Sequence, residues 1–311
     1  MRMKSLVNKE QYVSQVNLLL DCLPVLRDQD NFALKGGTAI NFFIRDLPRL
    51  SVDIDLTFLK YMDRNSAIFE IENGLRAMSQ SISKRNPRYK IKELKTQDGI
   101  LQKLMVIDHD TTIKIEPNFI MRGSLFLPEK MNLKKSIEKQ FAFSVKEIPV
   151  LARSEIYAGK ICAALARQHP RDFFDVKELL SNEGITDDIR QAFVVYLICS
   201  PRPMQELLNP NLIDISTIYK NEFLNMTEQE VSLDTLLETR KTLIKIIQKD
   251  LSKDERNFIL SVKSGNPDYS LLPFKNIDKL PAVQWKLINI KKMDKKKHAD
   301  MLSKLKNILE L

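Results

Sequence analysis

Two aspartates separated by one residue are the side chains best suited to bind a divalent cation. Asp53 and Asp55 stand in the segment Leu50-Ser-Val-Asp-Ile-Asp-Leu-Thr-Phe58. Residues i and i+2 of a β-strand project to the same side, so the two carboxylates can share magnesium, or manganese, which prefers oxygen ligands. A lone Asp-x-Asp is more often a solvated polar strand face, and its surroundings decide between the two interpretations.

A glycine turn stands shortly before the aspartates. Lys35, Gly36, Gly37 and Thr38 follow a short apolar strand over 32–34. Open backbone N–H groups, a hydroxyl and the positive end of a helix dipole suit phosphate oxygens. We expect Thr38 to cap a helix that runs to about Arg45. Alone this would be a plain turn; beside a carboxylate pair it predicts a phosphate pocket opposite a metal site.

The elements that must position these residues can be read from hydrophobic periodicity. Residues 50–58 alternate between apolar and polar, which predicts a strand with one buried face, and 88–95, 100–107 and 111–120 predict further strands. Helical spacing predicts helices over 8–28 and 64–83, and helices prevail from Ser154 onward. We therefore predict an α+β protein, with a mixed sheet and helices in residues 1–150 and a helical domain in residues 151–311.

The residues quoted above resemble a known family. Lys35-Gly-Gly-Thr-Ala-Ile-Asn41 followed by Arg49-Leu-Ser-Val-Asp-Ile-Asp-Leu56 is similar to the first motif of the AbiEii/AbiGii abortive-infection toxins, nucleotidyltransferases of the DNA polymerase β superfamily. The spacer before the aspartates is longer than in most of the superfamily and typical of these toxins. The resemblance implies attack on the α-phosphate of a nucleoside triphosphate with magnesium on Asp53 and Asp55, and phosphate contacts from Arg49 and Ser51.

A third carboxylate is expected on a neighbouring strand. Ile113-Lys-Ile-Glu-Pro-Asn118 predicts a strand whose Lys114 and Glu116 share a face. By the resemblance, Glu116 would complete the metal site or act as the general base toward the attacking hydroxyl. An edge-strand acid paired with a lysine explains the same residues equally well.

A second group of charged residues lies in the helical part. Lys160, Ala164 and Arg167 share one stripe of a helix that Pro170 ends, and Asp172 and Asp175 share a face of the next helix. Phe173, Val176 and Leu180 are expected on its core side. The resemblance implies that Lys160 and Arg167 contact the nucleotide, with Asp172 or Asp175 holding the lysine or a base-contacting loop. A helix–helix salt-bridge cluster is the alternative.

Charge and composition limit the remaining possibilities. The net charge is +9, and residues 275–311 hold ten lysines against four acidic residues, a local excess of +6. Such a tail can attract phosphate backbones, although a solvated helix face is more common. Cys22, Cys162 and Cys199 are scattered among apolar residues, which favours reduced core cysteines, and Trp285 is expected in the core. Without a signal peptide or spanning segment, a cytoplasmic protein is expected.

The resemblance also implies partners. It implies a bacterial toxin–antitoxin system with a cognate winged-helix antitoxin encoded nearby, and an RNA acceptor such as a tRNA 3′ end. Two alternatives remain open at this point. One is a nucleotidyltransferase that modifies a protein or a small molecule such as an aminoglycoside, and the other is a nucleotide-binding module that has lost turnover.

Overall fold

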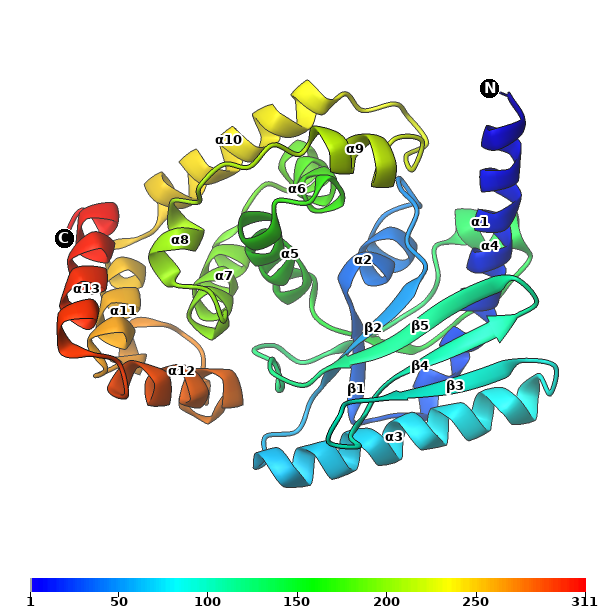
Figure 1. The fold of residues 1–311 in the computed structure, drawn as a ribbon, viewed down its shortest axis with the longest axis horizontal. Helices are drawn as coiled ribbons and strands as arrows, with labels where there is room; N and C mark the ends of the chain where they lie inside the picture. Colours follow the sequence, from blue (N-terminus) through cyan, green and yellow to red (C-terminus); the bar gives the residue numbers. More distant parts are fainter. Residues whose placement is uncertain (1) are drawn as a thin grey trace. The chain divides into compact units, whose positions relative to one another are not determined.

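The computed structural model describes the backbone of residues 2–311 and the side chains from residue 12 onward. The chain divides into two compact units, Met1–Ala152 and Arg153–Leu311 (Figure 1). The first combines a mixed sheet with helices and the second is helical, which confirms the α+β prediction. Within the described chain, no helix is both long and apolar enough to cross a bilayer.

The first unit is built from the following elements: α1 (Arg2–Cys22), η1 (Leu23–Asp28), β1 (Phe32–Lys35), α2 (Gly36–Thr38), the π-helical segment η2 (Ala39–Ile44), β2 (Asp53–Phe58), α3 (Arg64–Arg85), β3 (Lys90–Lys95), β4 (Leu101–Asp108), β5 (Thr111–Asn118), β6 (Glu129–Met131), α4 (Lys135–Phe141) and β7 (Ile148–Val150).

The strands of the described residues form one seven-stranded sheet in the order β3-β4-β5-β2-β1-β7-β6. β2 is therefore the central strand. It pairs antiparallel with β1 and parallel with β5 (Figure 1). β1 in turn pairs parallel with β7, and β4 pairs antiparallel with both β3 and β5.

The alternation of β2 separates an apolar face from a polar one. Ile54, Leu56 and Phe58 are fully buried, and Phe32 of β1 meets the Phe58 ring edge-on at 5.5 Å. α1 packs against β5 and α3 against β4. A Cβ atom at Gly74 of α3 would stand 2.4 Å from the Phe32 ring, so a glycine is needed where α3 packs against this ring.

Several predicted details of the first unit are wrong. The helix after β1 begins at Gly36, and Thr38 lies within it rather than capping it. The strand with the aspartates starts at Asp53 instead of Leu50. Three short elements, β6, α4 and β7, were not predicted. The helix predicted over 8–28 is α1 followed by η1, and the side chains of its residues 8–11 lie outside the described ones.

The second unit consists of the following elements: α5 (Arg153–Arg167), α6 (Pro170–Asn182), α7 (Asp187–Cys199), α8 (Met204–Leu208), α9 (Ser216–Glu222), α10 (Leu233–Asp250), α11 (Lys253–Ser264), η3 (Tyr269–Leu271), η4 (Ile277–Lys279), α12 (Pro281–Lys291) and α13 (Lys295–Leu309).

The core of the second unit matches the predicted pattern in part. Phe173 and Val176 of α6 are buried as predicted, but Leu179 is buried in place of Leu180. The three cysteines are free and buried, as expected. The prediction for Trp285 is wrong, because its side chain is 62% exposed. Helical spacing turns Val283 and Ile290 of α12 inward and leaves Trp285 on the outer face.

Candidate active site

The predicted carboxylates lie together on the polar face of the first unit. In the pairing of β2 with β5, Asp55 is opposite Glu116 and Asp53 is opposite Lys114. On its other side, Asp55 is opposite Lys35 of β1. Side chains that face each other across neighbouring strands share one side of a sheet. The fold therefore gathers three acids and two lysines on one patch of the central strands.

Gly36 gives this patch its shape. Its φ of +72° is left-handed, which glycine adopts without the steric cost that other residues carry. A Cβ atom at Gly36 would stand only 2.5 Å from Oδ2 of Asp55. The Asp55 carboxylate thus lies against the bare backbone at the start of α2, where a side chain would displace it.

Gly37 makes a second close approach, to the residues before β2. A Cβ atom there would stand 2.6 Å from Oγ of Ser51 and 2.8 Å from Nη2 of Arg49. Arg49 is buried and donates from Nη1 to the Leu50 carbonyl oxygen at 2.7 Å. The expected phosphate contacts Arg49 and Ser51 therefore border the glycine turn, as a shared phosphate pocket requires.

Thr38 joins the turn to the aspartate strand from inside the protein. Its side chain is fully buried, and its hydroxyl donates to the Asp53 carbonyl oxygen at 2.5 Å and lies 3.2 Å from Oγ of Ser51. A hydroxyl engaged in this way fixes the position of Asp53 relative to α2. Thr38 therefore links the glycine turn to the aspartate strand, and its phosphate contact stays a prediction.

The two aspartates fit a magnesium ion better than the full predicted triad does. Mg²⁺ is commonly held by one or two carboxylates, with water and substrate phosphates completing the shell. Asp53 and Asp55 supply that donor set beside the Gly36 cradle. Among the described residues, no group of three or more His, Cys, Asp or Glu side chains is arranged to hold a metal ion. The metal role of Glu116 stays a prediction.

Glu116 has a partner that the sequence did not reveal. Its carboxylate accepts a hydrogen bond from Nζ of Lys103 on β4 at 3.3 Å. The alternative interpretation expected an acid on an edge strand, but β5 lies between β4 and β2. Lys103 reaches Glu116 because β4 pairs with β5, and this register is set by residues distant in sequence.

The predicted charged residues of the second unit form one buried cluster. Nζ of Lys160 lies 2.9 Å from Oδ1 of Asp172 and 2.9 Å from Oδ2 of Asp175. All three side chains are buried. Burial alone would raise the pKa of Asp172, but the charge of Lys160 and the hydrogen bonds and charge of Arg167 hold it well below its ordinary value. Both aspartates thus hold the lysine, the arrangement that both interpretations share.

Arg167 completes the cluster from its solvent side. Its Nε and Nη2 both donate to the Asp172 carboxylate, at 2.5 and 2.9 Å. Its side chain is 62% exposed. α5 already ends at Arg167, and Pro170 begins α6. His169 caps α6 by accepting a hydrogen bond from the N–H of Arg171. At the corner between α5 and α6, Arg167 is therefore held by the buried Asp172 while much of its side chain remains exposed to solvent.

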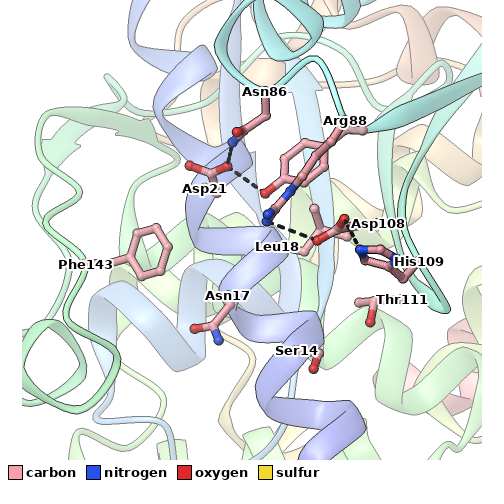
Figure 2. Close-up of a pocket in the computed structure, with 11 residues that line it drawn as sticks. Ser14, Asn17, Leu18, Asp21, Asn86, Arg88, Asp108, His109, Thr111 and Phe143 are labelled. Atoms are coloured by element: carbon pink, nitrogen blue, oxygen red, sulfur yellow. Dashed lines mark hydrogen bonds and ion pairs between the residues drawn. The ribbon is translucent and has the colours of Figure 1, made fainter.

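A cavity of about 490 Å³ in the first unit is separate from these residues (Figure 2). In Figure 2, Asp21 is hydrogen-bonded to Asn86, and Arg88 forms an ion pair with Asp108. Asp21 also accepts a hydrogen bond from the Tyr89 hydroxyl at 2.8 Å. The strand residues that line the cavity, Asp108 and Thr111, project to the same face as Ile54, so the cavity lies on the opposite side of the sheet from Asp53 and Asp55. The lining residues are Ser14, Asn17, Leu18, Asp21, Asn86, Arg88, Tyr89, Asp108, His109, Thr111 and Phe143.

The comparisons with known proteins define the class of the chain, a nucleotidyltransferase. The model of the family described as "Nucleotidyl transferase AbiEii toxin, Type IV TA system" matches residues 18–289. The chain therefore belongs to the AbiEii family of nucleotidyltransferase toxins, of type IV toxin–antitoxin systems.

A solved structure has a similar fold. MenT4, a nucleotidyltransferase toxin from Mycobacterium tuberculosis H37Rv, is similar to the chain with a TM-score of 0.60 and 15% sequence identity. The match covers 90% of this chain and 93% of that one. At this identity the likeness shows a common fold. A search of curated proteins finds no match.

Proposed function

We propose that the protein is a magnesium-dependent toxin that transfers a nucleoside monophosphate from a nucleoside triphosphate to an RNA, the 3′ end of a tRNA. One observation carries the proposal. Asp53 and Asp55 share a face of the central strand, with the Asp55 carboxylate against the bare backbone of Gly36. Two carboxylates beside a glycine turn are suited to a cation and a triphosphate together.

Each group of the first unit has a role in this reaction. Asp53 and Asp55 would hold Mg²⁺ or Mn²⁺, which when bound lowers the negative charge of the triphosphate. Gly36 and Gly37 present backbone N–H groups to phosphate oxygens, with Lys35, Arg49 and Ser51 at the border of the turn.

The chemical step is an in-line displacement at the α-phosphorus. A hydroxyl oxygen of the acceptor forms the new P–O bond, the bond to the β-phosphate oxygen breaks, and pyrophosphate leaves. Glu116, in register with Asp55 and paired with Lys103, is the group proposed to accept the hydroxyl proton. In the second unit, we assign Asp172 and Asp175 to holding Lys160, and Arg167 to a phosphate contact.

The test is transfer of label from each of the four α-labelled nucleoside triphosphates to total tRNA, with and without magnesium. Label should appear on RNA. Asp53→Asn or Asp55→Asn should reduce transfer at least about a hundredfold, because each variant halves the negative charge that binds the cation. Asp98→Asn, in the turn between β3 and β4, is the matched control. Label on a polypeptide or a small molecule would support a different acceptor, and no label with any triphosphate would refute the proposal.

The biological part of the proposal is tested by growth. We propose that expression in the bacterial cytoplasm slows growth, and that a winged-helix antitoxin encoded nearby restores it. The Asp53→Asn variant should not slow growth at equal protein level. Growth inhibition that persists in this variant would separate toxicity from nucleotide transfer.

A further inference from the structure

The outer face of α12 exposes the only tryptophan of the sequence. Trp285, Ile288, Asn289 and Lys292 are all exposed, and their spacing of i, i+3, i+4 and i+7 places them on one stripe of the helix. The opposite stripe, with Val283 and Ile290, is buried in the second unit. The helix is thus anchored from one side and leaves the Trp285 ring exposed to solvent.

Five exposed lysines follow this tryptophan in the sequence. Lys291 and Lys292 end α12, and Lys295, Lys296 and Lys297 occupy the first turn of α13. All are exposed, and in the described chain none of the five forms an ion pair. The first turn of α13 contains no acidic residue. Cations there oppose the helix dipole, so these lysines do not stabilise the helix that carries them.

We infer that this α12–α13 surface, defined as Trp285, Ile288, Lys291, Lys292 and Lys295–Lys297, binds the RNA acceptor. An unpaired base stacks on the Trp285 ring while the lysines contact the neighbouring phosphates. Aromatic rings stack with any base, and lysines that neutralise phosphates release counterions, so the two features together form a single-strand RNA surface. The inference rests on the proposed function for the identity of the acceptor.

The composition of the surface favours RNA over a protein partner. The centre of a protein–protein interface is depleted of charged residues, and lysine in particular is rare there. Here lysines follow the apolar stripe directly, at the end of α12 and the start of α13. An aromatic side chain beside lysines matches a single-stranded RNA, in which bases that can stack alternate with charged phosphates.

The protein carries its own reporter for this surface. Because Trp285 is the only tryptophan, the intrinsic fluorescence of the unlabelled protein reports directly on its surroundings. Titration with total tRNA and with a single-stranded RNA oligonucleotide should quench this fluorescence to saturation, and added salt should weaken the binding. Inorganic polyphosphate, which has phosphates but no bases, should compete with RNA without the same quenching. RNA binding that leaves the fluorescence unchanged would overturn the inference.

Variants separate stacking from general charge. Trp285→Ala should weaken RNA binding about tenfold, as expected for loss of one stacked base, and Trp285→Phe should retain most of the affinity. Phe69→Ala is the matched control, because Phe69 of α3 is equally exposed, at 62%, and lies in the other unit. The triple variant Lys295→Gln, Lys296→Gln, Lys297→Gln should reduce the salt dependence, whereas Lys245→Gln with Lys249→Gln on α10 should not.

The outcomes distinguish this inference from the proposed function. If the wild type labels RNA and Trp285→Ala binds and labels it equally well, the surface inference is wrong and the proposed function stands. If RNA quenches Trp285 but no label is transferred, the surface stands and the proposed function fails. Quenching that depends on protein concentration without RNA would mean that a second copy covers Trp285, which would overturn the inference.

Discussion

A Cβ atom at Gly36 would stand 2.5 Å from Oδ2 of Asp55, at a backbone φ of +72°. Gly36→Ala therefore combines backbone strain with displacement of a proposed metal ligand. We expect a loss of about 1–2 kcal/mol of stability from the left-handed backbone alone, and transfer activity reduced at least about tenfold. Denaturant unfolding and label transfer measure the two effects.

Gly99 provides the matched control for this variant. Its φ is +81°, and a Cβ atom there would meet nothing within 4 Å. Gly99→Ala should show the backbone cost alone, with activity unchanged. Equal activity of the two alanine variants would argue against a role for the Gly36 cradle.

Thr38→Val tests the link between the turn and the aspartate strand. The valine removes a buried hydroxyl and leaves the Asp53 carbonyl oxygen without its 2.5 Å donor. An unsatisfied buried acceptor costs about 1–3 kcal/mol, and we expect kcat to fall because Asp53 is less well held. Thr38→Ser keeps the hydroxyl and should recover activity. A loss of triphosphate affinity with unchanged kcat would instead indicate a direct phosphate contact.

Lys160→Met tests whether the cluster of the second unit is structural. The variant leaves the buried Asp172 and Asp175 without the ammonium that both contact at 2.9 Å. Removal of one partner from a buried ion cluster costs about 3–5 kcal/mol, so thermal unfolding should occur at a much lower temperature. Wild-type stability would contradict a buried ionised cluster.

Arg167→Gln should separate function from stability in the same cluster. Because the arginine side chain is 62% exposed, its ion pair should contribute no more than about 1 kcal/mol. If Arg167 contacts the triphosphate, KM for the triphosphate rises while the unfolding temperature changes little. An unchanged KM would limit Arg167 to its pairing with Asp172.

Lys286 gives the second unit a pH dependence. Burial lowers its pKa from 10.5 to about 8, and its Nζ donates to the Arg202 carbonyl oxygen at 3.1 Å. Between about pH 8 and 10.5 the unfolded chain binds a proton at Lys286 that the folded chain lacks. The free energy of unfolding therefore increases with pH across this window. Lys286→Gln should remove this contribution, seen as a smaller slope in denaturant unfolding across that window. If the wild type and Lys286→Gln have the same slope, the Lys286 ammonium is exposed to water in the folded protein.

The parts of the fold with strong periodicity were predictable. The alternation through Ile54, Leu56 and Phe58 predicted β2 and its buried face, and α3 was predicted within two residues of its C-terminal end at Arg85. β6 and β7 are each three residues long, too short to show a period, and they form only because β7 pairs with β1 and β6 with β7.

The candidate site was predictable in its residue types but less so in its geometry. The Asp-x-Asp spacing alone places both carboxylates on one face, whereas the Glu116–Lys103 pair depends on the register between β4 and β5. Thr38 was wrongly predicted as the N-cap because the helix starts at the left-handed Gly36, with Lys35 as its N-cap. Trp285 was misplaced because large apolar size favours burial on average but does not decide which face a helix turns inward.

The central position of β2 has a consequence for synthesis of the toxin. β2 lies between β1, which precedes it by about twenty residues, and β5, which ends at Asn118. A growing polypeptide on the ribosome therefore cannot assemble the acidic patch until residue 118 has emerged, because long-range strand pairing must come first. A chain that stops before β5 lacks Lys114 and Glu116 and leaves one side of β2 without its partner strand, so it cannot form the complete acidic patch.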